Sequence, residues 1–132
     1  MNADRDIGQK ERYQPVDLAG KAWRLTVFID ETDRYGHHPL YSEIVHRAHR
    51  IGLAGATVIR AMEGYGASNH ISTTRLLTLS EDLPLMVVII DRRERIEQFL
   101  PDLDEVLADG LAIVDEVRVL HYSGRKPPVA RP

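Results

Sequence analysis

Four segments of this chain alternate apolar and polar residues or run almost continuously apolar, and both patterns are typical of β-strands. They are Trp23–Asp30 (WRLTVFID), Ala56–Glu63 (ATVIRAME), Leu83–Asp91 (LPLMVVIID) and Ala112–Tyr122 (AIVDEVRVLHY). The third is the most strongly apolar, as expected of a central strand. A further short element is predicted at Leu76–Leu79, ahead of the third segment.

A helical period replaces this alternation in two other segments. In Leu40–Gly52 the charged residues Glu43, Arg47 and Arg50 fall opposite an apolar stripe, so this helix should lie against one face of a sheet. Arg92–Leu107 repeats the pattern but contains Pro101. Because proline lacks the N–H that a helix interior needs, we predict a kink or two short helical pieces there.

The predicted elements follow the order β-α-β-β-α-β. This order is typical of the α+β, ferredoxin-like fold, a four-stranded antiparallel sheet with two helices on one face. The other face has no helix, yet the strands carry too many apolar residues for all of them to point inward. We therefore expect some apolar surface to remain on the sheet and to mediate oligomerisation.

Length and composition set the domain organisation. A chain of 132 residues fits a single core. Residues 1–21 are polar and residues 123–132 are basic and proline-rich, so we predict a flexible N-terminal arm, a folded domain over 22–122 and a flexible C-terminal tail.

Charge and cysteine content narrow the functional class. A net charge of -3 argues against a general nucleic-acid binder, which needs a basic surface. The chain has no cysteine, no apolar run of membrane-spanning length and no signal-peptide core at its N-terminus, so a cytoplasmic location is expected.

The connection between the second and third strands is the main candidate site. It reads EGYGASNHISTTR, which is longer and more polar than an ordinary hairpin tip. Its glycines permit close approach of a ligand to the backbone, and its side chains supply hydroxyl, imidazole and guanidinium groups. The candidate ligand-binding residues are Gly64, Tyr65, Gly66, Ser68, His70, Thr73, Thr74 and Arg75. A solvated hairpin extension remains the alternative.

The run FIDETDRYGHHPLYSEIVHRAHRIGLAGATVIRAMEGYG, followed by LSEDLPLMVVIID and DEVRVLHY, resembles the PII-like proteins of domain of unknown function 190. The resemblance covers roughly Trp23–Tyr122 and implies a GlnB-like homotrimer that senses small effectors, nucleotides among them, in clefts between subunits. In such proteins the long loop after the second strand contacts a target. The resemblance also implies an association with fluoride-export membrane proteins.

One feature of PII proteins is missing from this chain. They carry a glycine- and lysine-rich phosphate cradle before the last strand, where this sequence has only Leu107–Leu111 (LADGL). ATP binding in the PII manner is therefore not expected, which leaves a smaller nucleotide or another small anion as the effector.

A metal-binding trimer resembling the divalent-cation-tolerance proteins is the alternative function. His37 and His38 stand beside carboxylates in the first loop, and His46 and His49 are one helical turn apart. The spacing matches no metal-binding signature, so no metal site is assigned and the first pair is the better candidate.

An enzyme is the third hypothesis. The carboxylates Asp30, Glu31, Asp91, Asp115 and Glu116 are candidates for acid–base chemistry. Most of them lie at strand ends or in turns, where carboxylates commonly cap chain reversals, and no G-x-S-x-G nucleophile motif is present. We therefore expect a protein that is not an enzyme.

Overall fold

The computed structural model describes residues 18–67, 69–74 and 82–124. Most of the predicted arm (1–21) and tail (123–132) lies outside the described residues. The same holds for the predicted element at Leu76–Leu79 and for the candidate ligand-binding residues Ser68 and Arg75.

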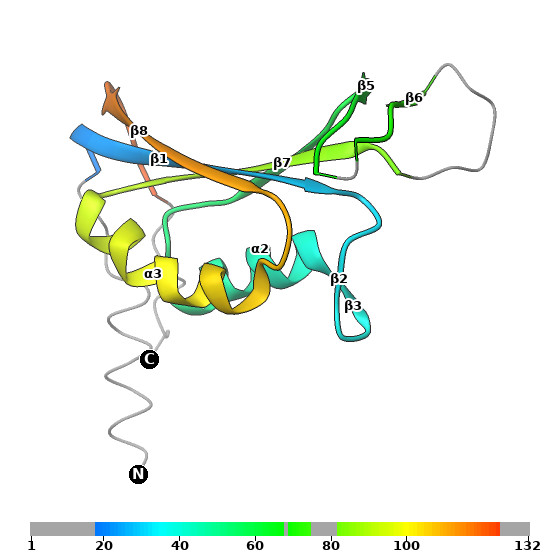
Figure 1. The fold of residues 1–132 in the computed structure, drawn as a ribbon. Coiled ribbons are helices and arrows are strands. Elements are labelled where there is room, and N and C mark those ends of the chain that lie inside the picture. The colour runs from blue at the N-terminus through cyan, green and yellow to red at the C-terminus, as the bar shows by residue number, and fades with distance from the viewer. Residues whose placement is uncertain (1–17, 68, 75–81, 125–132) are drawn as a thin grey trace, which may run out of the picture.

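Four strands form one antiparallel sheet, and both described helices lie against the same face of it (Figure 1). In spatial order the strands are β4 (Thr57–Arg60), β7 (Pro84–Asp91), β1 (Gly20–Asp30) and β8 (Leu111–Val119). The helices are α2 (Leu40–Arg50) and α3 (Arg93–Val106). In chain order these elements read β-α-β-β-α-β, which confirms the predicted α+β, ferredoxin-like fold.

Side chains of the central strand β1 alternate between the two faces of the sheet. Leu25, Val27 and Ile29 belong to the buried core, whereas the intervening Thr26 and Phe28 lie on the face that the helices leave open. Both helices complete the core with buried side chains: Leu40, Ile44, Ala48, Ile96, Phe99, Leu103 and Val106.

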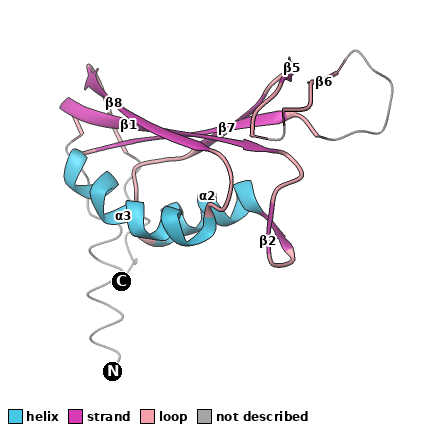
Figure 2. Cartoon of the chain, viewed as in Figure 1, coloured by secondary structure: helices cyan, strands magenta, loops and turns pink. Residues whose placement is uncertain are grey.

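Two short ribbons lie outside the main sheet (Figure 2). One pairs β2 (Arg34–Tyr35) with β3 (His38–Pro39), in a segment expected to be a loop. The other pairs β5 (Glu63–Gly64) with β6 (Ser72–Thr73).

The predicted second strand, Ala56–Glu63, is therefore wrong at its C-terminal end, because β4 stops at Arg60. Ala61 still donates its N–H to the Pro84 carbonyl oxygen (2.9 Å). Proline has no N–H with which to continue the ladder, so the chain leaves the sheet at this point and enters the β5–β6 ribbon.

Helix α3 runs without interruption through Pro101, so the predicted division into two helical pieces is wrong. Pro101 is exposed, where water can satisfy the carbonyl that loses its partner. Phe99 and Leu103 are buried on either side of it, and their packing holds both halves of the helix on the sheet.

Arg47 links the two helices. Its guanidinium donates hydrogen bonds to the carboxylates of Glu43 (2.9 Å), Asp102 (3.3 Å) and Glu105 (3.0 Å). Its Cζ also lies 5.2 Å from the centroid of the Tyr35 ring in β2. Through Arg47, the polar side of α2 therefore contacts α3. Only 12% of the Arg47 side chain is exposed.

Asp91, the last residue of β7, joins three segments at its end of the sheet. Its buried carboxylate accepts hydrogen bonds from the backbone N–H groups of Ala54 (2.9 Å) and Arg92 (2.7 Å) and from Nε of Arg95 (3.1 Å). Arg95 also donates to the carbonyl oxygen of Gly52. This carboxylate thus joins the end of β7, the start of α3 and the segment after α2, which is a structural role.

We expect Asp91→Ala to lower the free energy of unfolding by about 3 kcal/mol, because it leaves the Arg95 charge and two partly buried N–H groups without their acceptor. Denaturant unfolding at fixed protein concentration measures this loss. The control is Asp104→Ala, which removes an exposed carboxylate of α3 and should change stability by less than about 0.5 kcal/mol. Equal losses in the two variants would contradict the assigned role.

We also expect a pH-dependent contribution from Glu105. Hydrogen bonding to Arg47 and the Arg47 charge hold the pKa of Glu105 below its ordinary value of 4.5. A carboxylate with a lowered pKa stabilises the fold above its unfolded-state pKa, and this stabilisation is lost as the pH falls through the folded-state pKa. Glu105→Gln should therefore reduce Tm relative to wild type at about pH 6, with a smaller difference at about pH 3.

Thermal unfolding of wild type and Glu105→Gln at both pH values measures this effect. The control is Asp104→Asn, a substitution of an exposed carboxylate outside the Arg47 cluster. A Tm difference for Glu105→Gln that is the same at both pH values would argue against the ionised pair.

Candidate ligand-binding site

The β5–β6 ribbon projects from the end of the sheet where β1 ends and β7 begins (Figure 1). At its base, a Cβ on Gly64 would lie 3.1 Å from Cγ of Pro84, so the ribbon packs closely on the first residue of β7. The N–H of Thr74 donates to the carbonyl oxygen of Met62 (2.9 Å) and continues the ribbon beyond its two ladder pairs. The predicted long connection is thus an ordered structure at its base.

One backbone hydrogen bond and one left-handed residue are described at the turn of the ribbon. The N–H of Asn69 donates to the carbonyl oxygen of Gly66 (2.8 Å), and Asn69 has a φ of 57°. Asparagine is among the residues that tolerate this left-handed conformation. The segment from Tyr65 to Ala67 lines the same cavity as the end of β1.

A cavity of about 510 Å³ lies beneath this segment. Three parts of the chain line it, namely the end of β1 with the turn after it, the base of the ribbon, and the junction between α3 and β8. The lining residues are Phe28, Ile29, Asp30, Asp33, Tyr65, Gly66, Ala67, Asp109, Gly110 and Leu111. A volume of this size accommodates a small organic ligand.

The cavity lining is acidic. Asp30, Asp33 and Asp109 contribute carboxylates, and no described lining residue is cationic. One oxygen of Asp33 accepts the backbone N–H of Asp30 (3.0 Å), so part of this charge holds the turn after β1. The second oxygen of Asp33 and the carboxylate of Asp109 suit hydroxyl or amino groups of a ligand, and an anionic group would need its counter-charge from elsewhere.

Gly110 allows the junction between α3 and β8 to approach the end of β1. Its φ is 138°, and a Cβ at this position would lie 2.7 Å from the carbonyl oxygen of Phe28. Only glycine adopts this conformation without strain and leaves room for the β1 backbone. The short α3–β8 junction can therefore lie directly against β1 and form one wall of the cavity.

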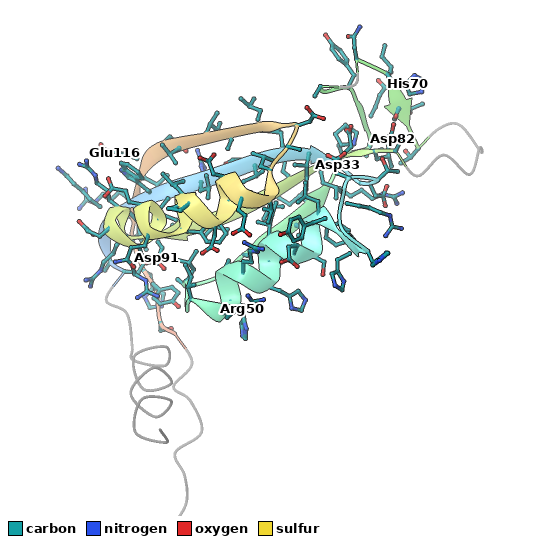
Figure 3. All side chains as sticks on the ribbon, turned by 60° about the horizontal axis from the view of Figure 1, so that its bottom comes forward. Asp33, Arg50, His70, Asp82, Asp91 and Glu116 are labelled. Atoms are coloured by element: carbon teal, nitrogen blue, oxygen red, sulfur yellow. The ribbon has the colours of Figure 1, made fainter. Side chains whose placement is uncertain are left out.

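Two of the predicted ligand-binding residues lie in the cavity wall, namely Tyr65 and Gly66. Three others, Gly64, Thr73 and Thr74, lie in the ribbon, where their backbones pair across β5 and β6. His70 is exposed on the ribbon and does not line the cavity (Figure 3).

Of the rest of the cavity wall, sequence reasoning names Asp30 only as an acid–base candidate and misses the other residues. In the sequence, Asp33 is only one of the carboxylates beside the histidines. Asp109 and Gly110 belong to the short segment found where PII proteins carry their phosphate cradle. Gly110 just before the last strand is the available signal, because glycine at such a junction often marks a close backbone approach.

Two exposed apolar residues of the ribbon region are also missed. Met62 is 74% exposed and Ile71 is 63% exposed, and the predicted Tyr65 is 64% exposed. Large apolar side chains with this much exposure on a projecting ribbon are suited to contact a partner.

The remaining sequence-based candidates lie elsewhere. His37 and His38 are exposed at the β2–β3 ribbon. Within residues 18–67, 69–74 and 82–124, no group of three or more His, Cys, Asp or Glu residues is arranged to hold a metal ion. Neither described helix has the length and apolar character of a membrane span.

We expect Gly110→Ala to lower the free energy of unfolding by about 2 kcal/mol, because alanine would combine an unfavourable φ with a clash against the Phe28 carbonyl. Denaturant unfolding measures the loss. Gly55→Ala is the matched control, since a Cβ at Gly55 meets nothing within 4 Å. If the two variants have the same stability, Gly110 does not hold the junction against β1.

Comparison with known proteins agrees with this architecture. A UPF0166 protein of Aquifex aeolicus (strain VF5) is 36% identical over 97 residues, which cover 74% of this chain and 91% of that protein. A UPF0166 protein of Methanocaldococcus jannaschii is 32% identical over 105 residues, which cover 79% of this chain and 94% of that protein.

The fold is also similar to that of a solved structure from Thermus thermophilus, described as a putative PII-like signaling protein. The TM-score is 0.58 at 20% identity, with 80% of this chain and 94% of the other covered. The model of the family DUF190, described as Uncharacterized ACR, matches residues 22–119. The chain therefore belongs to the DUF190 family.

Proposed function

We propose that this protein is a non-enzymatic regulator that acts as a homotrimer. It binds a small anionic effector, with nucleotides as the candidate class, in a cleft between subunits and presents the β5–β6 ribbon to a target protein. The observation that carries this proposal is the cavity at the base of the ribbon, because one ligand there would contact both the ribbon and the rigid sheet.

The exposed face of the sheet supports assembly. Three large apolar side chains on it remain substantially exposed in the single chain: Ile59 at 48%, Leu111 at 56% and Ile113 at 44%. Phe28 and Leu111 belong to this face and also line the cavity. A second copy packed on the face would bury these side chains and close the cavity on its open side.

The acidic lining indicates which part of the effector this subunit holds. Carboxylate oxygens accept hydrogen bonds from hydroxyl and amino groups, which a nucleoside offers on its sugar and base. Tyr65 provides an aromatic surface beside them. The negative charge of the effector would then be met outside the described lining, by the neighbouring subunit or by the sequence candidates His70 and Arg75.

Regulation would operate through a shift of population. An effector that contacts Tyr65 and Gly66 binds better to the conformation in which the ribbon lies over the end of β1, and so favours that conformation. The exposed Met62 and Ile71 would change position with the ribbon and alter its contact with a target. A membrane transporter, such as a fluoride exporter, is our candidate for this target.

We expect the purified protein to show a thermal shift with at least one of ATP, ADP, AMP, cyclic nucleotides or bicarbonate. For the nucleotide that binds, Tyr65→Ala should weaken binding by about tenfold or more, because it removes the aromatic wall of the cavity. Isothermal titration calorimetry measures the Kd.

The control for this experiment is Met62→Ala, which shortens another exposed side chain of the ribbon region that does not line the cavity. It should leave the Kd within about twofold of wild type. A protein that binds none of these compounds, or an unchanged Kd in Tyr65→Ala, would refute the proposed effector site.

A further inference from the structure

The register of the strands shows how the uncovered face of the sheet is built. Directly opposed residues point to the same face, so its side chains form rows across the four strands. The row nearest the cavity is Ile59, Met86, Phe28 and Leu111, and the next is Thr57, Val88, Thr26 and Ile113. The third row is Ile90, Arg24 and Asp115, followed by Ala22 and Val117.

Arg24 and Asp115 are unusual on this face. Among the side chains that the described strands place there, only these two and Asp30, at the end of β1, carry a charge. Arg24 donates from Nε to Oδ1 of Asp115 (3.0 Å) and from Nη2 to Oδ2 (2.6 Å). The pair therefore has the two-point geometry in which both groups are held in one orientation.

The pair is only partly satisfied within one chain. The exposed fractions of the two side chains are 46% and 43%. A guanidinium has five N–H donors, and each carboxylate oxygen can accept more than one hydrogen bond. Burying this face would therefore leave donors of Arg24 and acceptors of Asp115 without partners, unless the covering surface supplied complementary groups at the same place.

A second copy of the same face meets this requirement. It brings both an acceptor and a donor, set side by side by the same strand register, and it brings apolar rows to cover the remainder. A surface with charge of one sign would satisfy only one member of the pair. The charge pattern of the face is thus complementary to itself.

On the basis of the proposed homotrimer, we propose that Arg24 of each subunit also binds Asp115 of the next, so that the pairs close into a ring of alternating charges. The ring fixes the register of the subunits, whereas the apolar rows supply most of the attraction. The neighbours of Arg24 on the same strand and face, Ala22 and Thr26, carry no charge that would compete for its donors.

The test measures molar mass in solution by sedimentation equilibrium over a range of protein concentrations. Wild type should be a trimer. Asp115→Asn and Arg24→Gln should each raise the concentration of half-dissociation by about tenfold or more, because each leaves a buried charge without its partner. The double variant Arg24→Asp/Asp115→Arg restores complementarity within and between subunits and should recover most of the trimer.

The matched control is Glu97→Gln, which removes the carboxylate of the exposed Arg93–Glu97 pair of α3, on the covered side of the sheet. It should leave the half-dissociation concentration unchanged. Circular dichroism at the same concentrations shows whether each variant is folded, and the double variant tests the proposal even if a single variant unfolds.

The outcomes separate this inference from the proposed function. A monomeric wild type would refute both the homotrimer and the ring. A wild-type trimer that the two single variants leave intact, or that the charge-exchanged double variant does not recover, would refute the ring alone. Effector binding at the cavity would be unaffected by that second result.

Discussion

The alternation of side chains along β1 is the constraint on which the rest of the molecule depends. Leu25, Val27 and Ile29 are buried against α2 and α3, and their burial fixes which face of the sheet the helices cover. The residues between them are thereby assigned to the open face. Since β1 hydrogen-bonds to β7 on one side and β8 on the other, a slip of one residue would exchange the two faces throughout the sheet.

The two ends of the sheet have different roles. At one end Asp91 ties β7, α3 and the segment after α2 into a buried hydrogen-bonded junction. At the other end β1 stops, the ribbon leaves the sheet, and a cavity remains among three segments. Among the described strands, β5 and β6 pair only with each other, so the ribbon lies outside the hydrogen-bonded ladder of the main sheet.

The charged side chains of this chain fall into two groups, those paired within the fold and those that remain accessible. Arg47 and its three carboxylate partners are paired with one another within the chain and link the two helices. The cavity carboxylates of Asp33 and Asp109 and the Arg24–Asp115 pair remain accessible in the single chain. Groups of this second kind retain unused hydrogen-bonding capacity, so a ligand or a neighbouring subunit can use it.

The hydrophobic pattern by itself determined the fold, because periods of two and 3.6 residues specify strands and helices and their order specifies the ferredoxin-like topology. The glycines and polar side chains of the long connection also indicated Tyr65 and Gly66 as candidate ligand-binding residues. The continuity of α3 through Pro101, the end of β4 at Arg60 and the contact of Gly110 with β1 were not predictable, because each depends on packing between segments distant in sequence. The tertiary structure alone brought Asp33 and Asp109 to the cavity and Arg24 beside Asp115, since strand register and chain reversal, rather than local sequence, decide which side chains meet.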